Sequence, residues 1–276
     1  HRPYDQNILK DSTDLEDVKL PPYVPDTPEV RADYALYYDE IRRLDRFVGM
    51  VIAELKRQKV DKNTLVMFTS DNGRPMPRDK TTLYDSGVRT PWIVRWPDKV
   101  KPNTVNSNLV SSVDIARTFM DLAGAKYGET FVGNSFMPML EDTEVSIRSY
   151  AFGEKNWHDF SDRCRYVRDE RFKYIRNFYP HYPNTPSADA LRSPVFREMQ
   201  VLRDAGKLTP AQMSCFIKPR PVEELYDVVN DPYELANLAG RPEYAEDLKR
   251  LRLQLKLWQK RTHDQDPEFE APDEFD

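Results

Sequence analysis

The stretch from Leu65 to Pro97 constrains the fold of this chain more than any other. An apolar run, Leu65 to Phe68, leads through Thr69 and Ser70 into Asp71-Asn72-Gly73, and a second apolar run, Trp92 to Val94, follows. Short apolar runs of this kind predict buried β-strands. Ligands of open α/β sheets gather just beyond the carboxyl ends of the strands. Asp71 and Asn72 are therefore predicted at a ligand-binding edge.

The residue types at this edge suggest that it binds a metal cation and an anionic group. The carboxylate of Asp71 and the amide oxygen of Asn72 are hard ligands that suit Ca²⁺ or Mg²⁺. The alternative is a plain tight turn, in which Asp, Asn and Gly are all favoured. Lys80 follows shortly, and its flexible ammonium could meet an anion as a point charge. Arg78 is a competing cation, and an exposed loop lysine is the alternative for Lys80.

A long helix is predicted upstream of this stretch, from Thr27-Pro28 to about Lys59. Threonine is a favoured N-cap, and proline is favoured at the first helical position. Apolar residues then recur at steps of three and four and form one apolar face: Val30, Tyr34, Tyr37, Ile41, Leu44, Val48, Val51 and Leu55. A strand from Thr64 to Ser70 follows, and a helix before a buried strand fits a doubly wound sheet.

The second half of the chain predicts a small antiparallel unit. A short helix from about Val113 to Leu122 closes at Gly124, a favoured residue after a helix. Cys164 to Val167 and Phe172 to Ile175 flank a polar turn and predict a hairpin. The final helix, roughly Glu243 to Arg261, should pack on this sheet. We place a domain boundary near residues 141–146, which divides the chain into 1–145 and 146–276.

Composition excludes several classes of protein. The net charge of −5 argues against binding of a nucleic-acid backbone, which relies on basic patches. No apolar run approaches the roughly 20 residues that a membrane-spanning helix needs. The two cysteines provide neither a disulfide framework nor zinc spacing.

Arg89 and Asp114 are interpreted as a buried structural pair, because buried charges are usually paired.

The whole stretch from Leu65 to Pro97 resembles the sulfatase family of the alkaline-phosphatase-like superfamily. Other segments resemble the same family. Glu224 to Asp227 with Asn230 to Glu234 resembles its C-terminal signature, and His1-Arg2-Pro3-Tyr4 resembles the end of its histidine-proline-histidine stretch. Pro21 to Asp33 and Trp258 to Asp264 resemble the sulfamidase (N-sulfoglucosamine sulfohydrolase) branch. The resemblance spans nearly the whole chain but only the later part of a sulfatase.

The resemblance implies a fold and a set of roles. The fold is α/β and alkaline-phosphatase-like, with a mixed sheet flanked by helices and a smaller C-terminal antiparallel sheet covered by the terminal helix. Asp71 and Asn72 would bind a divalent cation, Ca²⁺ or alternatively Mg²⁺, and Lys80 would contact the sulfate. His1 would donate a hydrogen bond to the sulfate or protonate the leaving oxygen, because histidine titrates near neutral pH.

A second group of candidates would bind the sugar. Glu154, Trp157, His158 and Asp159 follow a predicted strand. An indole ring can cover a sugar face, while His158 and Asp159 could bind hydroxyls or a charged amine. The alternative is an ordinary loop with a packing tryptophan.

The family's nucleophile motif, C/S-x-P-S-R, does not occur among the 276 residues. Cys164 lies in D-R-C-R-Y and Cys215 in M-S-C-F-I, and neither fits. We therefore expect a C-terminal portion of a sulfatase, or one chain of a divided enzyme. The formylglycine nucleophile would lie in the N-terminal part, and this chain alone would hydrolyse no sulfate ester.

The predicted function is part of a sulfatase that hydrolyses sulfate esters or sulfamates of a saccharide, with heparan-type glucosamine sulfate favoured. The resemblance implies a periplasmic, secreted or lysosomal location and allows a homodimer. One alternative is a phosphate-ester hydrolase of the same superfamily. The four histidines are scattered, which argues against a zinc-binding member. The other alternative is a saccharide-binding relative without catalytic activity.

Overall fold

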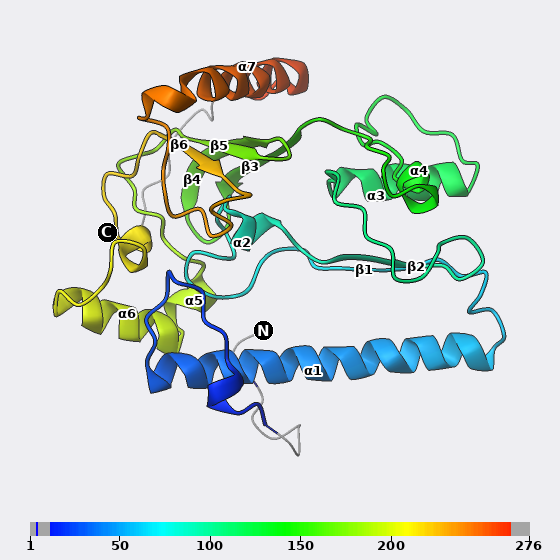
Figure 1. The fold of residues 1–276 in the computed structure, drawn as a ribbon, viewed down its shortest axis with the longest axis horizontal. Coiled ribbons are helices and arrows are strands. Elements are labelled where there is room, and N and C mark those ends of the chain that lie inside the picture. Colours follow the sequence, from blue (N-terminus) through cyan, green and yellow to red (C-terminus); the bar gives the residue numbers. More distant parts are fainter. Residues whose placement is uncertain (1–3, 5–11, 266–276) are drawn as a thin grey trace.

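The computed structural model describes residue 4 and residues 12–265, which form two antiparallel sheets with helices around them (Figure 1). Strands β1 (Val66–Thr69) and β2 (Trp92–Arg95) pair with each other. The second sheet has the order β3-β4-β5-β6. Its strands are Ala151–Trp157, Ser161–Arg168, Phe172–Asn177 and Glu223–Asp227. This mixed α/β architecture agrees with the predicted fold class.

Helix α1 (Pro28–Arg57) begins where the sequence predicts it and ends two residues before Lys59. The Thr27 hydroxyl accepts the backbone N–H of Val30 at 3.4 Å, and Pro28 occupies the first turn. A side-chain cap of this kind satisfies one of the free N–H groups that every helix start leaves. The short 3₁₀ helix η1 (Leu15–Asp17) precedes α1.

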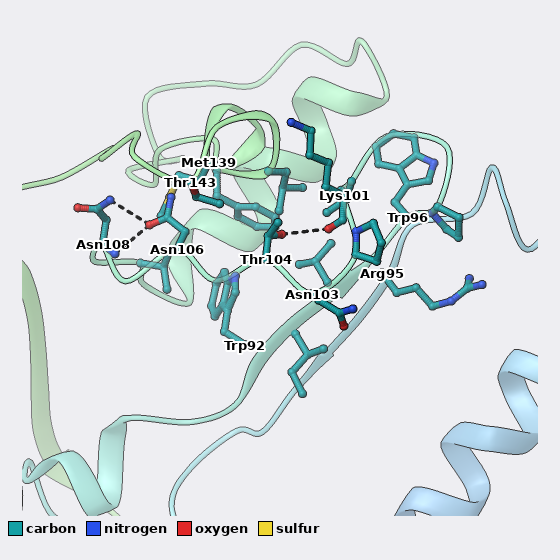
Figure 2. A pocket seen from close by; sticks show the side chains of 18 residues that line it. Trp92, Arg95, Trp96, Lys101, Asn103, Thr104, Asn106, Asn108, Met139 and Thr143 are labelled. Atoms are coloured by element: carbon teal, nitrogen blue, oxygen red, sulfur yellow. Dashed lines mark hydrogen bonds between the residues drawn. The ribbon is translucent and has the colours of Figure 1, made fainter.

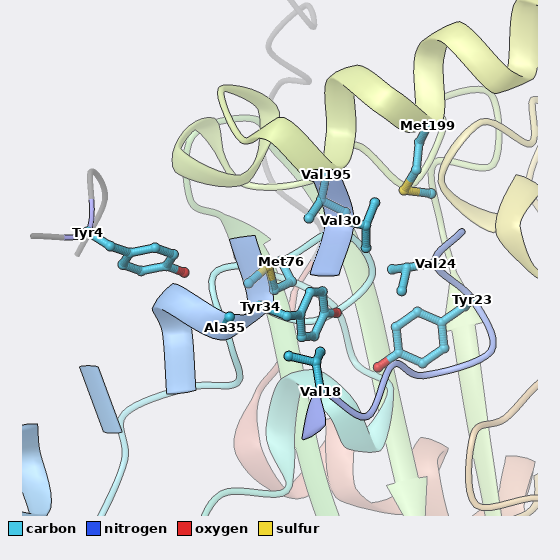
Figure 3. Packing of buried hydrophobic residues seen from close by; sticks show 10 residues of the cluster. All are labelled: Tyr4, Val18, Tyr23, Val24, Val30, Tyr34, Ala35, Met76, Val195 and Met199. Atoms are coloured by element: carbon cyan, nitrogen blue, oxygen red, sulfur yellow. The ribbon is translucent and has the colours of Figure 1, made fainter. Parts of the chain in front are cut away.

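The first half of α1 belongs to a buried cluster that also holds the loop after β1 (Figure 3). Val30 and Tyr34 of α1 have no exposed surface, and Met76 from that loop is equally buried against them. Helix α6 (Pro194–Asp204) adds Val195 and Met199 to the cluster. Apolar burial of this extent fixes the loop after β1 against α1 and α6.

The second half of α1 is largely exposed, so the predicted apolar face is buried only in part. Ile41 and Leu44 are each 45% exposed, and Val51 is 56% exposed. The periodicity is real, but a helix face is buried only where another element covers it. In the described chain, α6 and the segment before α1 cover only the first turns.

Strands β1 and β2 form a ribbon in the register Val66↔Arg95 to Thr69↔Trp92. The sequence predicts buried strands, whereas these strands are half-buried or exposed along their length. In Figure 1 the ribbon runs beside α1, and within the described residues each strand pairs only with the other. The expected doubly wound unit is therefore absent from residues 12–265. A strand is buried on both faces only where layers cover both.

The four-stranded sheet confirms the predicted hairpin and terminal helix. Strand β4 pairs with β5 from Cys164↔Asn177 to Arg168↔Lys173. Helix α7 (Ala245–Thr262) buries three leucines on the sheet: Leu248, Leu251 and Leu255. Figure 1 shows α7 lying across this sheet. Helix α3 spans Val113–Leu122 as predicted, and Gly124 follows it with a φ of 60°.

Short helices complete the described chain: α2 (Asp85–Val88), α4 (Met137–Glu141), α5 (Ala188–Leu191), η2 (Gln212–Cys215) and η3 (Pro242–Tyr244). Both cysteines are buried and free. Among residues 4 and 12–265, no helix combines the length and apolarity that a membrane crossing requires. The domain boundary near residues 141–146 stays a prediction.

The predicted pairing of Arg89 with Asp114 is wrong. Asp114 is buried and accepts a hydrogen bond from Arg148. Its carboxylate also accepts the backbone N–H groups of Ser111 and Asn134, each at 2.8 Å. Arg89 has a side chain that is 72% exposed. The buried carboxylate is therefore satisfied by groups near its own helix and does not need Arg89.

Candidate functional site

Asp71 and Asn72 follow the last residue of β1 directly, as the sequence predicts. The Asp71 carboxylate is exposed, and its Oδ1 accepts the Asn72 N–H at 3.0 Å. The Asn72 side-chain amide donates to the Gly73 carbonyl at 2.7 Å. In the described chain these bonds leave Asp71 Oδ2 and Asn72 Oδ1 open. Two hard oxygens are thus available side by side in sequence, which is the donor type that Ca²⁺ and Mg²⁺ prefer.

The backbone after these residues closes tightly on helix α2. The N–H of Gly73 donates to the carbonyl of Gly87 at 2.8 Å. A Cβ on Gly73 would lie 2.0 Å from the Ser86 carbonyl oxygen, and one on Gly87 would lie 2.4 Å from the carbonyl oxygen of Asp79. Only glycine allows two backbone segments to approach so closely. The two glycines therefore shape the loop of residues 71–88, called the site loop below.

The site loop contains a buried ion pair, and the hydroxyl of Tyr23 ties this pair to the segment before α1. Asp79 has no exposed surface, and its carboxylate contacts Arg74 at 2.7 Å. The Tyr23 hydroxyl donates to the same carboxylate at 2.7 Å. Burial raises the pKa of Asp79 to about 6, although Arg74 and the Tyr23 hydroxyl act in the opposite direction. The anchor fixes the residue immediately before Lys80.

Arg78, the competing cation, is committed to the interior. Its guanidinium donates to the carbonyl oxygens of Tyr233 and Glu234 at 3.0 and 2.6 Å. It also lies over the Tyr84 ring, 3.7 Å from the centroid. Only 2% of the residue is exposed, and its φ is 66°. A cation so enclosed offers no approach to a ligand, so its contacts favour Lys80 as the anion-binding residue.

Lys80 remains accessible but has one partner in the described chain. Its side chain is 18% exposed, and Nζ lies 3.3 Å from Asp189 Oδ2. Asp189 belongs to α5 and also accepts the Ser187 hydroxyl at 2.5 Å. Burial would raise the pKa of Asp189, but Ser187 and Lys80 together hold it below its usual value. The sequence prediction missed Asp189, because no local pattern marks a partner so distant along the chain.

The four residues predicted to bind sugar lie on and beside one hairpin, and two of them lie within a strand. Glu154 and Trp157 belong to β3, whereas His158 and Asp159 form the turn before β4. The prediction that all four follow a strand is therefore wrong for the first two. Trp157 is 61% exposed, and Glu154 lies 3.6 Å from Arg165. Exposure of an indole at a hairpin end leaves its face open to a ligand.

The structure brings the hairpin turn and Lys80 together through α5. Asp159 Oδ2 accepts the backbone N–H of Ala188 at 2.6 Å and lies 2.9 Å from His158 Nδ1. The next residue, Asp189, contacts Lys80. No direct contact joins Asp71 or Asn72 to Lys80 in the described chain; they share the site loop. His1 lies outside the described residues.

A buried charge cluster lies beneath the end of the site loop. Lys173 of β5 contacts Asp85 at 2.7 Å and Glu234 at 3.1 Å, and its side chain has no exposure. Arg168 also donates to Asp85, and the N–H of Asp85 donates to Glu234 at 2.5 Å. Glu234 belongs to the stretch that the sequence singles out as a C-terminal signature. Its observed role is to hold α2, and with it the site loop, on the four-stranded sheet.

A cavity among the described residues is lined by a different set of side chains, shown in Figure 2. Its volume is about 670 Å³, and β2, the loop of residues 100–110 and α4 line it. Trp92, Phe136 and Met139 contribute apolar walls. No residue of the predicted site lines it. We therefore assign it to the scaffold and not to the site.

The described residues offer only part of a metal site. No group of three or more His, Cys, Asp or Glu side chains in residues 4 and 12–265 is arranged to hold a metal. Asp71 and Asn72 fit as two ligands of a hard cation through their open oxygens. The remaining ligands of such a cation would have to come from groups other than Asp71 and Asn72.

Two family models match the chain. The model described as "Sulfatase" matches residues 5–125, and the model described as "N-sulphoglucosamine sulphohydrolase, C-terminal" matches residues 77–195. The chain belongs to the sulfatase family. The range of the second model contains Lys80, the β3–β4 turn and Asp189.

Curated relatives agree with this placement. An ulvan-active sulfatase from Formosa agariphila is 39% identical over 87% of this chain and 40% of its own length. Human N-sulphoglucosamine sulphohydrolase is 35% identical over 93% of this chain and 53% of its own length. The chain thus spans about half the length of the curated relatives it matches.

Solved structures support the fold. The structure of a protein in complex with its substrate D-glucosamine-2-N,6-O-disulfate matches with a TM-score of 0.64, at 24% identity, over 86% of this chain and 42% of that one. A phosphonate monoester hydrolase of Agrobacterium radiobacter matches with a TM-score of 0.57, at 24% identity, over 85% and 42%. At these identities the likeness establishes the shared fold and not the reaction.

Proposed function

We propose that this chain forms the C-terminal part of a sulfatase that removes sulfate from a saccharide, with sulfated glucosamine as the favoured substrate. The observation that carries the proposal is the site loop. Its open oxygens of Asp71 and Asn72 lie directly after a strand, and Lys80 is a partly exposed cation of the same loop. We use "complete enzyme" below for this chain together with the part that supplies the nucleophile.

The residues divide into two roles. Asp71 and Asn72 would hold a divalent cation, Ca²⁺ or Mg²⁺, which when bound supplies positive charge beside the sulfate oxygens. Lys80 would bind one sulfate oxygen through its ammonium, where charge develops during the reaction. The family resemblance implies a formylglycine nucleophile, and His1 would act as a proton donor beside it. Neither of these groups belongs to the described residues.

The hairpin turn would select the saccharide. Trp157 is exposed enough to cover a sugar face, and His158 with Asp159 offers acceptors and a donor for hydroxyls or an amine. Asp159 contacts Ala188 and Lys80 contacts Asp189, which are neighbouring residues of α5. Helix α5 therefore contacts both the proposed sugar-binding turn and the proposed sulfate-binding lysine. The match to the C-terminal family model of N-sulphoglucosamine sulphohydrolase favours glucosamine over other sugars.

Two other substrate classes are alternatives. The relative from Formosa agariphila is ulvan-active, which favours a different sulfated polysaccharide. A phosphorus ester is the second alternative; the phosphonate monoester hydrolase shares the fold, and this likeness carries no argument about the reaction. A saccharide-binding relative without catalysis would show binding and no turnover.

The test is a substrate panel with the complete enzyme: N-sulfoglucosamine, sulfated ulvan oligosaccharides, an aryl sulfate and an aryl phosphonate. We expect the highest kcat/KM with N-sulfoglucosamine. Metal content is measured in parallel for wild type, Asp71→Ala and, as a control, Asp98→Ala, whose aspartate is exposed on another loop. Loss of the cation in Asp71→Ala alone is expected. Equal cation content in all three proteins would refute the ligand assignment.

A further inference from the structure

On the basis of the function proposed above, we propose that Asp189 is a positioning residue that holds the Lys80 ammonium ready for the sulfate. Asp189 lies on α5, 109 positions along the chain from Lys80, and its Oδ2 is 3.3 Å from Nζ. Neither residue is fully buried: the side chains are 18% and 27% exposed. The contact is therefore placed where a ligand can reach it.

A lysine needs such a partner to act in one place. Its side chain is a flexible chain of four methylene groups, and ordering it costs conformational entropy. A contact that already orders the side chain in the free protein removes this cost from substrate binding. An ammonium has three N–H donors. In the described chain it donates to Asp189 alone, so donors remain for the oxygens of a sulfate.

The Asp189 carboxylate is itself held in one orientation. Oδ1 accepts the Ser187 hydroxyl at 2.5 Å and the backbone N–H of Ala190 at 3.0 Å. These two bonds leave Oδ2 directed to Lys80. Two supporting bonds on the opposite oxygen are what a positioning role requires, since a freely rotating carboxylate would not fix the lysine.

The support extends to the hairpin turn. Asp159 Oδ2 accepts the N–H of Ala188, the residue before Asp189, at 2.6 Å. The same oxygen lies 2.9 Å from His158 Nδ1. The turn that would contact the sugar therefore also braces the residue that holds Lys80. Sugar binding at the hairpin turn would therefore be coupled, through α5, to the order of the Lys80 side chain.

The experiment compares Asp189→Asn with wild type in the complete enzyme. The amide can still accept from Ser187, but its NH₂ group would face the ammonium and offer no acceptor charge. We expect kcat/KM to fall about ten-fold for both an aryl sulfate and N-sulfoglucosamine, with an unchanged melting temperature. Asp189→Glu should recover part of the loss. Asp204→Asn, at the exposed last residue of α6, is the matched control and should be neutral.

A double-mutant cycle separates positioning from an independent role. If Asp189 acts through Lys80, adding Asp189→Asn to Lys80→Ala should cause no further loss. An equal ten-fold loss in both backgrounds would overturn the proposal. If Asp189→Asn does not fold, Ser187→Ala is used in the same cycle instead, because it removes the hydroxyl that holds the Asp189 carboxylate.

A second readout is independent of activity. Acetylation of lysines by an N-hydroxysuccinimide ester, followed by peptide mass spectrometry, should modify Lys80 several-fold faster in Asp189→Asn than in wild type. Lys249, with a side chain that is 76% exposed, is the internal reference. Equal rates at Lys80 would show that Asp189 does not hold it and would overturn the proposal. Absence of sulfatase activity in wild type would refute the proposed function, while the labelling rates would still decide the contact.

Discussion

The buried charge cluster around Lys173 should be a main source of stability for the site loop. The perturbation is Lys173→Met, which keeps most of the side-chain volume and removes the charge. Lys173 has no exposed surface and faces Asp85 at 2.7 Å and Glu234 at 3.1 Å. Its contact with Glu234 is an ion pair, and both carboxylates are themselves buried.

The magnitude follows from these distances. At an effective dielectric constant of about 20, the gross attractions are about 6 and about 5 kcal/mol. Desolvation of each ion offsets several kcal/mol of this. Removing one partner of a buried pair costs about 3–5 kcal/mol, because the remaining charges stay buried. We expect a loss of this size in the free energy of unfolding. The control, Lys249→Met, removes an exposed lysine on α7 and should cost less than about 1 kcal/mol.

The pH dependence provides a second measure. Burial raises the pKa of Glu234, while Lys173 lowers it. In Lys173→Met the lowering influence is gone, so the folded-state pKa lies further above the unfolded value. A carboxyl with a raised pKa contributes stability that is lost as the pH rises through that pKa. The variant should therefore be closer to wild type at pH 5 than at pH 8.

The assay is urea unfolding monitored by tryptophan fluorescence at both pH values. A second substitution, Lys173→Met with Glu234→Gln, removes the unpaired charge and should recover part of the loss. A loss below about 1 kcal/mol that is identical at pH 5 and pH 8 would refute the reasoning. It would mean that the cluster does not behave as a buried ionic group.

Three further predictions concern single residues. Lys80→Ala should lower kcat/KM of the complete enzyme about ten- to a hundred-fold, because a charge-assisted contact contributes roughly 1.5–3 kcal/mol; unchanged kinetics would return Lys80 to an ordinary surface lysine. His158→Ala should lower kcat/KM for N-sulfoglucosamine and spare an aryl sulfate, which offers no ring hydroxyls or amine; equal losses on both would place His158 at the sulfate. Burial would raise the pKa of Asp162, but Lys155 and Arg220 hold it at about 2. This depressed pKa contributes stability that is present above the unfolded pKa and is lost as the pH falls through about 2. Asp162→Asn should accordingly lower the melting temperature at pH 7, and the difference from wild type should shrink towards pH 2.

The sequence by itself determined the local elements of this protein. Thr27 and Pro28 start α1, Gly124 ends α3, and the turn after Arg168 closes the β4–β5 hairpin. Each of these rests on interactions within a few residues, such as a cap or a preferred backbone angle. The position of Asp71 and Asn72 after β1 is of the same kind, because a strand and the turn after it are adjacent in sequence.

Only the tertiary structure decided which of these residues can act. Arg78 and Lys80 are two positions apart, yet one is enclosed by the C-terminal segment and the other meets Asp189. The apolar period of α1 continues through Val51, but among the described residues the buried cluster includes only its first half. The different surroundings of Arg78 and Lys80 depend on segments more than a hundred positions away. The burial of α1 depends on which of its turns other elements cover. Local propensity carries no information on either, because burial and ion pairing are set by the elements that the fold brings together.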